Sequence, residues 1–346
     1  MKYSLVSIVI ATLNSEKTLP FVLKAIKRQS YPKAKLEILI IDGGSKDSTL
    51  EVAKNYNARI IPNPKVDLVF AKHIGYKSAR GELLIFLDSD EVLENRDSIK
   101  NKCLIVMGND SVKAVISSGY KKPSAYPDIN YYINDYGDPF SLFMYRSGRD
   151  ANWFLRELAM KYPKAYENDL GVIFDFSSFP IPPFIELISM GVMIDLKYVK
   201  KTFPKILTMP SLHIHLFYLL LSKGNLVVVM KGDPVIHYSA ATIGGYLKKI
   251  RSRIKNNVYE TPMGKGGFKG RERYFPSWYR IKKFLFILYC LSFIAPAIDS
   301  MGLFLVRKKT IYLIHPFLCL YTLFLIVFYY TLKLLGVKIK LSGYGI

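Results

Sequence analysis

Apolar and polar residues alternate in blocks along the first 95 residues. A β-branched apolar run at residues 5–12 is followed by polar residues, and apolar side chains then recur every three or four positions from Leu19 to Ile26. The first pattern is typical of a strand buried on both faces, and the second of an amphipathic helix. Strand and helix patterns keep alternating, which indicates a parallel sheet covered by helices. The predicted strands are residues 5–12, 36–41, 59–61 and 83–87.

Two carboxylates follow the fourth predicted strand. Asp88 and Asp90 flank Ser89 directly after the apolar run at residues 83–87. Since ligands bind at the carboxyl edge of open parallel sheets, the two acids would open into a crevice there. Carboxylate oxygens suit Mg²⁺ or Mn²⁺, ions that also hold substrate phosphates. A solvated turn or a helix cap is the alternative for this pattern taken alone.

The second predicted strand ends in Asp42, Gly43 and Gly44. The glycines allow a tight turn and a close approach of the backbone to a ligand. Asp42 would accept hydrogen bonds from a nucleotide base or ribose, because its strand would neighbour the metal-binding strand. An Asx turn is the structural alternative for Asp42. Asp47 and Ser48 are interpreted as caps of the following helix.

Four segments of the first 95 residues form a recognisable set of motifs: Ser7–Asn14, Glu37–Thr49, Ala79–Glu82 and Phe86–Glu91. In order and spacing, they resemble the motifs of glycosyltransferase family 2. The resemblance implies a GT-A fold, a mostly parallel α/β sheet with helices on both faces. It also implies a nucleotide-diphosphate sugar as donor, Mg²⁺ or Mn²⁺ as cofactor, and inversion at the anomeric carbon.

The resemblance implies roles for individual residues. Asp88 would contact ribose or sugar, and Asp90 would hold the metal ion. Leu13 stands where many relatives carry a Tyr near the base, so the identity of the base stays open. The residues implied to border the nucleotide are Thr12, Asn14, Glu16 and Asp42.

The family's general base is the largest departure from the resemblance. Relatives often carry a Glu-Asp pair shortly before a Gly, whereas Leu212 and His213 occupy those positions before Gly224. A neutral His acts as a base near pH 7, so His213 is a candidate catalytic base. One alternative is a half-buried structural His. Another is an acceptor phosphate, which is already an anion and needs no base.

Two later features complete the candidate site. His237 ends a segment that resembles the family's strand beside the donor diphosphate, so His237 is a candidate third metal ligand after Asp88 and Asp90. A structural His at a strand end is the alternative. Arg251 and Arg253 stand where relatives carry a basic or aromatic motif, and they would clamp phosphates bidentately.

The C-terminal part of the chain differs in composition. Residues 284–305 and 311–335 are almost entirely apolar, and each is long enough to cross a bilayer, which takes about 20 helical residues. Pro296 and Asp299 interrupt the first, so a re-entrant or interfacial helix is an alternative there. A buried soluble hairpin is the alternative for both. Residues 248–283 contain twelve Lys or Arg and two Glu, a pattern typical of contact with anionic lipid headgroups.

The chain of 346 residues carries a net charge of +22. The basic charge abuts apolar segments and no nucleic-acid motif occurs, so nucleic acid is not an expected partner. The three Cys have no paired spacing, which favours a reducing compartment without a disulfide framework or zinc site. The predicted parts are a GT-A domain at 1–240 with a nucleotide-sugar half at 1–95 and an acceptor-side half at 96–240, a basic segment at 241–283, two membrane helices at 284–335 and a tail at 336–346.

Together, these features predict a membrane-anchored, metal-dependent inverting glycosyltransferase, similar to polyprenyl-phosphate or lipid-linked glycan glycosyltransferases. Its partners would be a UDP- or GDP-sugar donor, a lipid-linked acceptor and membrane lipids. The catalytic domain would lie on the cytoplasmic face of a multi-pass cell-membrane protein. The oligomeric state stays open, a homo-oligomer included. Two alternatives remain: a polysaccharide-extending glycosyltransferase, and a catalytically degenerate membrane protein that binds sugar nucleotides.

Overall fold

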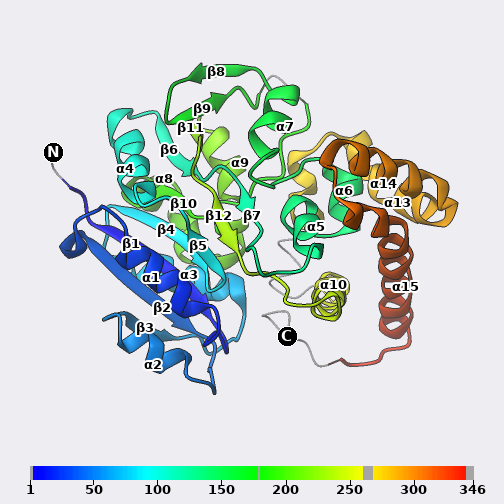
Figure 1. The fold of residues 1–346 in the computed structure, drawn as a ribbon, viewed down its shortest axis with the longest axis horizontal. Coiled ribbons are helices and arrows are strands. Elements are labelled where there is room, and N and C mark those ends of the chain that lie inside the picture. Colours follow the sequence, from blue (N-terminus) through cyan, green and yellow to red (C-terminus); the bar gives the residue numbers. More distant parts are fainter. Residues whose placement is uncertain (1–2, 178–179, 260–267, 340–346) are drawn as a thin grey trace.

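The computed structural model describes residues 3–177, 180–259 and 268–339. A large sheet of nine strands forms the centre of this part of the chain, with helices packed around it (Figure 1). In spatial order the strands are β3 (Arg59–Pro62), β2 (Leu36–Asp42), β1 (Val6–Thr12), β4 (Leu83–Asp88), β10 (Val192–Asp195), β6 (Val112–Ile116), β11 (Leu226–Met230), β9 (Gly171–Phe174) and β8 (Lys164–Glu167).

The first four strands confirm the pattern predicted from the first 95 residues. β3, β2, β1 and β4 pair in parallel in that order, and β1 is buried along its whole length. The register places Thr12 opposite Asp42, and Ala11 opposite Asp88. Because these residues end their strands, polar side chains gather at one carboxyl edge of the sheet, as parallel pairing requires.

The remaining strands correct the expectation of a mostly parallel sheet. β10 is antiparallel to both β4 and β6, and β9 is antiparallel to β11 and to β8. Only β6 and β11 are parallel in this half. The direction of each strand in this half depends on how the loops and helices of residues 96–240 connect one strand to the next. An apolar run in the sequence does not indicate whether its strand will be parallel or antiparallel to its neighbours. The sheet is therefore mixed, within an α/β fold.

A second sheet of three strands lies just beyond the end of β4. Its central strand β12 (Val235–His237) is antiparallel to β5 (Glu91–Leu93) and parallel to β7 (Tyr120–Lys121). The pairing places His237 opposite Glu91, directly after the turn that carries Asp90. Three segments that are far apart in the sequence thus meet beside the acids of β4.

Helices pack on the sheet as the periodicity predicts. α1 (Leu19–Lys27) buries Leu19, Val22, Leu23 and Ile26. The other helices before residue 260 are α2 (Thr49–Lys54), α3 (Leu68–Ser78), α4 (Ser98–Gly108), α5 (Ile129–Tyr136), α6 (Pro139–Tyr145), α7 (Phe154–Lys161), α8 (Leu196–Thr202), α9 (Leu216–Leu221) and α10 (Ile243–Val258), with short 3-10 helices η1 (Lys33–Lys35), η2 (Pro204–Leu207) and η3 (Pro210–His215).

α3 is the helix that matters most for the site. It packs onto β1 and β2. The approach to β1 is closest at Gly75, where a β-carbon would overlap the side chain of Val9. Only glycine fits this contact, and it holds the middle of α3 against the strand beside β4.

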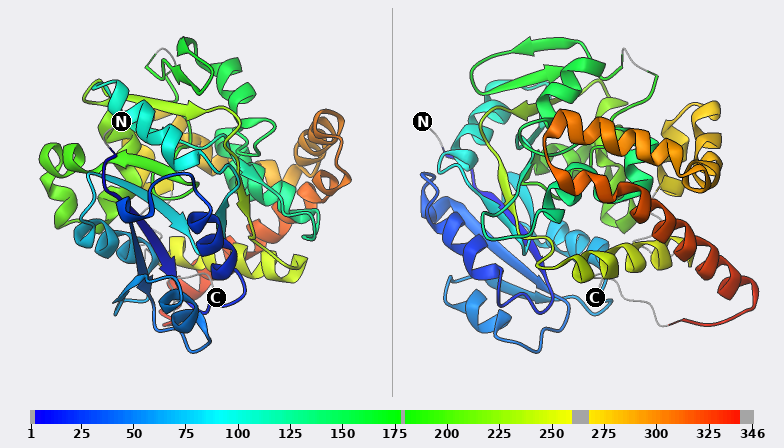
Figure 2. Two further views of the ribbon diagram at one scale, coloured as in Figure 1. Left: turned by 60° about the vertical axis from the view of Figure 1, so that its left-hand side comes forward. Right: turned by 45° about the vertical axis from the view of Figure 1, so that its right-hand side comes forward.

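The C-terminal helices extend away from the sheet domain (Figure 2). Residues 284–305, predicted as one membrane helix, fall in two helices that are bent by 89° at Phe293. A pair of helices with such a bend is either a broken span or a re-entrant loop, so the predicted first membrane helix is not confirmed and its re-entrant alternative stays open. The elements are α12 (Phe268–Arg271), η4 (Glu272–Tyr274), α13 (Ser277–Ser292), α14 (Ile294–Arg307), η5 (Thr310–Ile314) and α15 (His315–Leu334).

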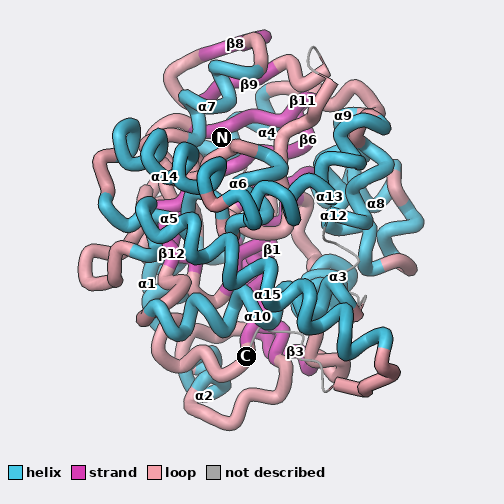
Figure 3. Tube along the Cα trace, turned by 90° about the vertical axis from the view of Figure 1, so that its right-hand side faces the viewer, coloured by secondary structure: helices cyan, strands magenta, loops and turns pink. Residues whose placement is uncertain are grey.

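Within the described ranges, one continuous stretch is long and apolar enough to cross a membrane, Thr310–Leu334. The helix α15 in this stretch lies beside α10 (Figure 3). Arg251 Nε donates to Tyr329 Oη at 2.9 Å, and Lys333 Nζ donates to the carbonyl of Val258 at 2.7 Å. One side of α15 is therefore occupied by a basic helix, and a two-helix membrane hairpin is not confirmed.

Buried polar contacts join the C-terminal helices to α5. Arg307 of α14 pairs with the fully buried Asp135, Nε to Oδ2, at 3.0 Å. His315 of α15 lies between two hydroxyl groups, 2.6 Å from Tyr132 Oη and 2.8 Å from Tyr289 Oη. α5 thus connects the C-terminal helices to the sheet domain.

Candidate active site at the carboxyl edge of the sheet

Asp88 is held at the end of β4 by a buried lysine. Its Oδ1 lies 2.6 Å from Nζ of Lys72 on α3, whose side chain is 1% exposed. Lys72 also donates to the carbonyl of Leu87 at 2.5 Å. Because Lys72 already balances the charge of Asp88, this carboxylate is fixed in orientation and is a weaker cation ligand than an unpaired one.

Asp90 faces two nitrogen atoms across the site. Its Oδ2 lies 3.7 Å from His237 Nε2 and 4.0 Å from Lys249 Nζ. Lys249 reaches in from α10 and is held by Ser239, whose carbonyl accepts from Nζ at 2.5 Å. Burial raises the pKa of Asp90, and the charges of Lys249 and Lys72 oppose that rise. The sequence-predicted Asp90 and His237 are thus brought together.

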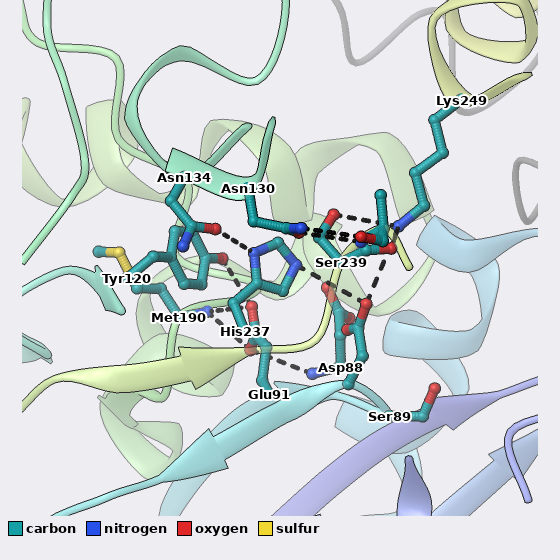
Figure 4. Close-up of polar contacts among 12 residues, drawn as sticks. Asp88, Ser89, Glu91, Tyr120, Asn130, Asn134, Met190, His237, Ser239 and Lys249 are labelled. Carbon is teal, nitrogen blue, oxygen red and sulfur yellow. Dashed lines mark hydrogen bonds and ion pairs between the residues drawn. The ribbon is translucent and has the colours of Figure 1, made fainter. Parts of the chain in front are cut away.

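The tautomer of His237 is fixed by α5. Figure 4 shows the ring of His237 facing the side chain of Asn134. His237 Nδ1 lies 2.9 Å from Asn134 Oδ1, and because a carbonyl oxygen only accepts, Nδ1 carries the proton. Burial, followed by the charge of Lys249, lowers the pKa of His237 to about 3. His237 is therefore neutral near pH 7, with the lone pair of Nε2 directed at Asp90.

These atoms fit a divalent cation. A carboxyl oxygen of Asp90 and the Nε2 atom of His237 face each other at 3.7 Å, and both are atom types that bind divalent cations. No group of three or more His, Cys, Asp or Glu side chains forms a metal cluster in the described ranges. Mg²⁺ and Mn²⁺ commonly take one or two protein carboxylates and complete their shell with substrate phosphates and water. Asp90 and His237 would hold such an ion, with Asp88 beside it.

Glu91 connects the two sheets and was not assigned a role from the sequence. It is fully buried and accepts from Tyr120 Oη at 2.6 Å, from Met190 N at 2.9 Å and from Asp88 N at 3.1 Å. Burial, with a contribution from Asp88, raises the pKa of Glu91 to about 8. Its partners come from distant segments, so no local pattern marks this residue.

Two buried asparagines of α5 hold the segment around β12. Asn134 binds His237, and Asn130 exchanges two hydrogen bonds with the backbone of Ala240, at 2.8 Å and 3.0 Å. Asn130 and Asn134 are four residues apart, so they lie on one face of α5. The spacing of these two asparagines in the sequence could have predicted that one face of α5 makes polar contacts.

Asp42 forms the Asx turn that was the structural alternative for it. Its Oδ2 accepts from the backbone of Gly44 at 2.8 Å and of Ser45 at 2.9 Å. Thr12 Oγ1 donates to Asp42 Oδ1 at 3.2 Å. Asp42 and Thr12 are both buried. Their contact with a nucleotide stays a prediction.

The other two residues implied to border the nucleotide tie neighbouring loops together. Asn14 Oδ1 accepts from Lys46 N at 2.9 Å, and Glu16 Oε2 accepts from Ser48 N at 3.0 Å. The loop after β1 is thereby fixed to the loop after β2. The four residues implied by the resemblance are brought together at one edge, beside the end of β4.

His213 lies away from solvent. It is 0% exposed on η3, and its Nε2 lies 3.1 Å from His73 Nδ1. Its ring also packs against those of Tyr76 and Phe86. Burial, with a contribution from His73, lowers the pKa of His213 to about 3. The role of general base stays a prediction, and this burial favours the structural alternative.

Arg251 and Arg253 point to different neighbours. Arg251 binds Tyr329 on α15, whereas Arg253 Nη1 donates to the carbonyl of Gly137 at 3.1 Å and lies 3.3 Å from Asp138 Oδ2. The structure does not bring the two guanidinium groups together as one clamp. The role of each in binding phosphate stays a prediction.

Comparisons with known proteins agree with this geometry. Residues 7–139 match the model of Glycosyl transferase family 2. The poly(ribitol-phosphate) beta-N-acetylglucosaminyltransferase TarS of Staphylococcus aureus is 28% identical over 108 residues, which are 29% of this chain and 18% of that protein. The glycosyltransferase AglE of Haloferax volcanii is 32% identical over 91 residues, 25% of this chain and 30% of that protein.

A third relative is the dolichyl N-acetyl-alpha-D-glucosaminyl phosphate 3-beta-D-2,3-diacetamido-2,3-dideoxy-beta-D-glucuronosyltransferase of Methanococcus voltae. It is 38% identical over 103 residues, 28% of this chain and 32% of that protein. The match therefore spans about a third or less of the length of each of these relatives.

Among solved structures, the chain is similar to the mannosyltransferase PcManGT of Pyrobaculum calidifontis, which was determined with GDP-Man and Mn²⁺. The TM-score is 0.50 at 11% identity, over 94% of this chain and 88% of that one. At this identity the likeness concerns the fold. The part of the chain that matches the family model, residues 7–139, contains the acids at the end of β4.

Proposed function

We propose that this protein transfers a sugar, with inversion, from a UDP- or GDP-sugar to a lipid-linked acceptor at a membrane surface, with Mg²⁺ or Mn²⁺ as cofactor. The observation that carries the proposal is the pair formed by Asp90 and His237 at 3.7 Å, at the sheet edge of a family 2 domain. A lipid-linked acceptor is supported by the name of the Methanococcus voltae relative, a dolichyl-phosphate glycan enzyme.

The site residues would divide the work. The loops after β1 and β2 would receive the nucleoside, and Asp88, held by Lys72, would orient the ribose or sugar. Asp90 and His237 would hold the cation, which supplies positive charge to the leaving diphosphate when bound. Lys249, 4.0 Å from Asp90, would add a positive charge beside the cation.

Attachment to a membrane is supported by the surface of the C-terminal helices. Many large apolar side chains of α13, α14 and α15 are exposed, far more than the scattered ones of an ordinary soluble surface. The basic helix α10 packs along the side of α15 that does not carry these exposed residues. If α15 crossed the membrane, the lysines and arginines of α10 would be moved into the hydrocarbon layer. We therefore propose that the helices lie in one leaflet. The most exposed are Trp278, Ile281, Phe284, Leu288, Leu291, Ile294, Ile298, Phe317, Phe324 and Leu334.

Each of the two alternative functions is supported by one specific observation. The similarity to TarS, named for poly(ribitol-phosphate), favours an enzyme that modifies or extends a polymer. The burial of His213 and the absence of the Glu-Asp pair from its expected position favour a degenerate protein that binds sugar nucleotides without turnover.

An acceptor panel tests the proposal against both alternatives. UDP- and GDP-sugars with Mg²⁺ or Mn²⁺ are offered with a polyprenyl phosphate, a lipid-linked sugar or a soluble polymer. We expect metal-dependent transfer to one of the two lipid acceptors. Transfer to the polymer alone would favour the polymer enzyme. Donor binding without transfer or slow donor hydrolysis would favour the degenerate protein.

A further inference from the structure

Arg149 is an unpaired cation beside the candidate site. It follows α6, and its Nε is buried without a hydrogen-bond partner among the described residues. Its guanidinium lies over the rings of Phe184 and Tyr120, at 5.1 Å and 5.9 Å from their centres. Glu186 lines the same small cavity but pairs with Arg271. No carboxylate of the described chain forms an ion pair with Arg149.

Arg149 converges with Arg253 on one backbone position. Gly137 ends α5 in a left-handed conformation, with φ at +78°. Arg149 Nη2 and Arg253 Nη1 each lie 3.2 Å from the point that a β-carbon on Gly137 would occupy. Two guanidinium groups of like charge are therefore close together, and only Arg253 has an acidic neighbour, Asp138.

Lys249 adds a third cation on the same side of the site. The charges of Lys249, Arg149 and Arg253 all act on His237, against which the ring of Tyr120 stacks at 4.5 Å. Lys249 and Arg253 each have an acidic neighbour, Asp90 and Asp138, whereas Arg149 has none among the described residues. The cluster therefore keeps one positive charge that is not balanced, and a bound anion would balance it. Guanidinium groups present their donors in a planar fork that fits the oxygens of a phosphate.

We propose that Arg149, Arg253 and Lys249 form a binding subsite for a phosphate group. Two sources share this chemistry: the phosphate of a polyprenyl phosphate acceptor and the diphosphate of the donor. The position of the subsite favours the acceptor phosphate. The two arginines lie beside α5 and α10, and both helices contact the C-terminal helices. The loops predicted to receive the nucleoside of the donor instead follow β1 and β2. This assignment rests on the proposed function and specifies its acceptor as a phosphate monoester.

The chemistry of such an acceptor agrees with the burial of His213. An anionic phosphate oxygen would form the new bond to the anomeric carbon of the sugar. The bond from that carbon to the donor diphosphate would break, and its electron pair would leave with the nucleoside diphosphate. No proton has to be removed from the phosphate oxygen, so this step requires no general base.

Direct binding tests the subsite independently of turnover. Dissociation constants of the full-length protein in detergent are measured for a short-chain polyprenyl phosphate, for the matching polyprenol, and for UDP and GDP with Mn²⁺. The variants are Arg149→Gln and Arg149→Lys, with Arg156→Gln as control, since Arg156 is an exposed arginine on α7. Thermal melting of each variant confirms that it is folded.

We expect Arg149→Gln to weaken polyprenyl phosphate binding about 10- to 100-fold, the loss typical of a charge-assisted hydrogen bond. Arg149→Lys should lose less, and polyprenol and nucleotide binding should change less than about twofold. Weaker nucleotide binding alone would keep the phosphate subsite but assign it to the donor. Equal binding of polyprenyl phosphate and nucleotide by wild type and folded Arg149→Gln would overturn the proposal. Absence of transfer with intact phosphate binding would contradict only the proposed function.

Discussion

The first 95 residues and the C-terminal helices are both rich in apolar side chains, but they use them differently. In β1 every residue is buried, and Thr12 and Asp42, which end β1 and β2, contact each other. In α13, Leu288 and Leu291 are each 64% exposed, and buried polar contacts such as Arg307 to Asp135 fasten the helices to the sheet domain. Similar hydrophobicity therefore builds a core in one region and an outward surface in the other.

The largest effect should come from breaking the attachment between the two regions. Arg307→Ala leaves Asp135 buried without its cation, and loss of one partner of a buried ion pair typically costs about 3–5 kcal/mol. The free energy of unfolding, from urea titration in detergent, should fall by that amount. Arg146→Ala is the control, because Arg146 is 55% exposed in its pair with Asp299 and should cost less than about 1 kcal/mol. Equal losses in the two variants would contradict the anchoring role of Arg307.

The outward apolar surface can be tested by making it polar. The triple variant Phe284→Ser, Leu288→Ser and Leu291→Ser removes side chains that would each contribute about 1.5–3 kcal/mol on burial in lipid. Flotation with vesicles that contain anionic lipid should show at least about 100-fold weaker binding.

The matched control for vesicle binding changes exposed apolar residues of the sheet domain, Phe21, Met160 and Tyr166, to Ser. This control should float like wild type. If both triple variants bound vesicles as tightly as wild type, the membrane surface would not be α13.

A smaller effect concerns the buried histidine of the sheet domain. The pKa of His213 is lowered by burial to about 3, so the folded state stays neutral while the unfolded state takes up a proton below its usual pKa of about 6.5. Stability is therefore present above pH 6.5 and is lost as the pH falls toward 3.

His213→Leu should remove this acid sensitivity. Between pH 7 and pH 5, the loss of unfolding free energy should be smaller in the variant by about 2 kcal/mol. Urea titrations at the two pH values measure the difference. An unchanged pH dependence would contradict the buried neutral state of His213, and a turnover loss of about 1000-fold would instead make it the general base.

Much of the first region could be predicted from the sequence because its signals are local. Apolar runs gave the bounds of β1, β2 and β4 within a residue or two, and the position of Asp88 at a strand end followed from them. The direction of β10 could not be predicted, because its three buried apolar residues do not indicate which way the strand runs in the sheet. Pro296 and Asp299 indicated an interruption of the first apolar run, but they did not indicate that the helix breaks at Phe293.

The site divides in the same way. Asp90 and His237 stood out because one closely follows a predicted strand, the other ends one, and both segments resemble family motifs. Glu91, Lys72 and Asn134 were missed, since each acts through a partner far away in the sequence and has no pattern of its own. Residues that carry the chemistry were thus easier to predict than the residues that hold them in place.

The central claim is that Asp90 helps to hold the cation used in sugar transfer. The most direct measurement compares Mn²⁺-dependent sugar transfer to a lipid acceptor by wild type, Asp90→Ala and the control Asp169→Ala, which changes an exposed acid. Loss of the cation's contribution of several kcal/mol predicts a fall of roughly 1000-fold in Asp90→Ala and little change in Asp169→Ala. Full Mn²⁺-dependent transfer by folded Asp90→Ala would contradict the account.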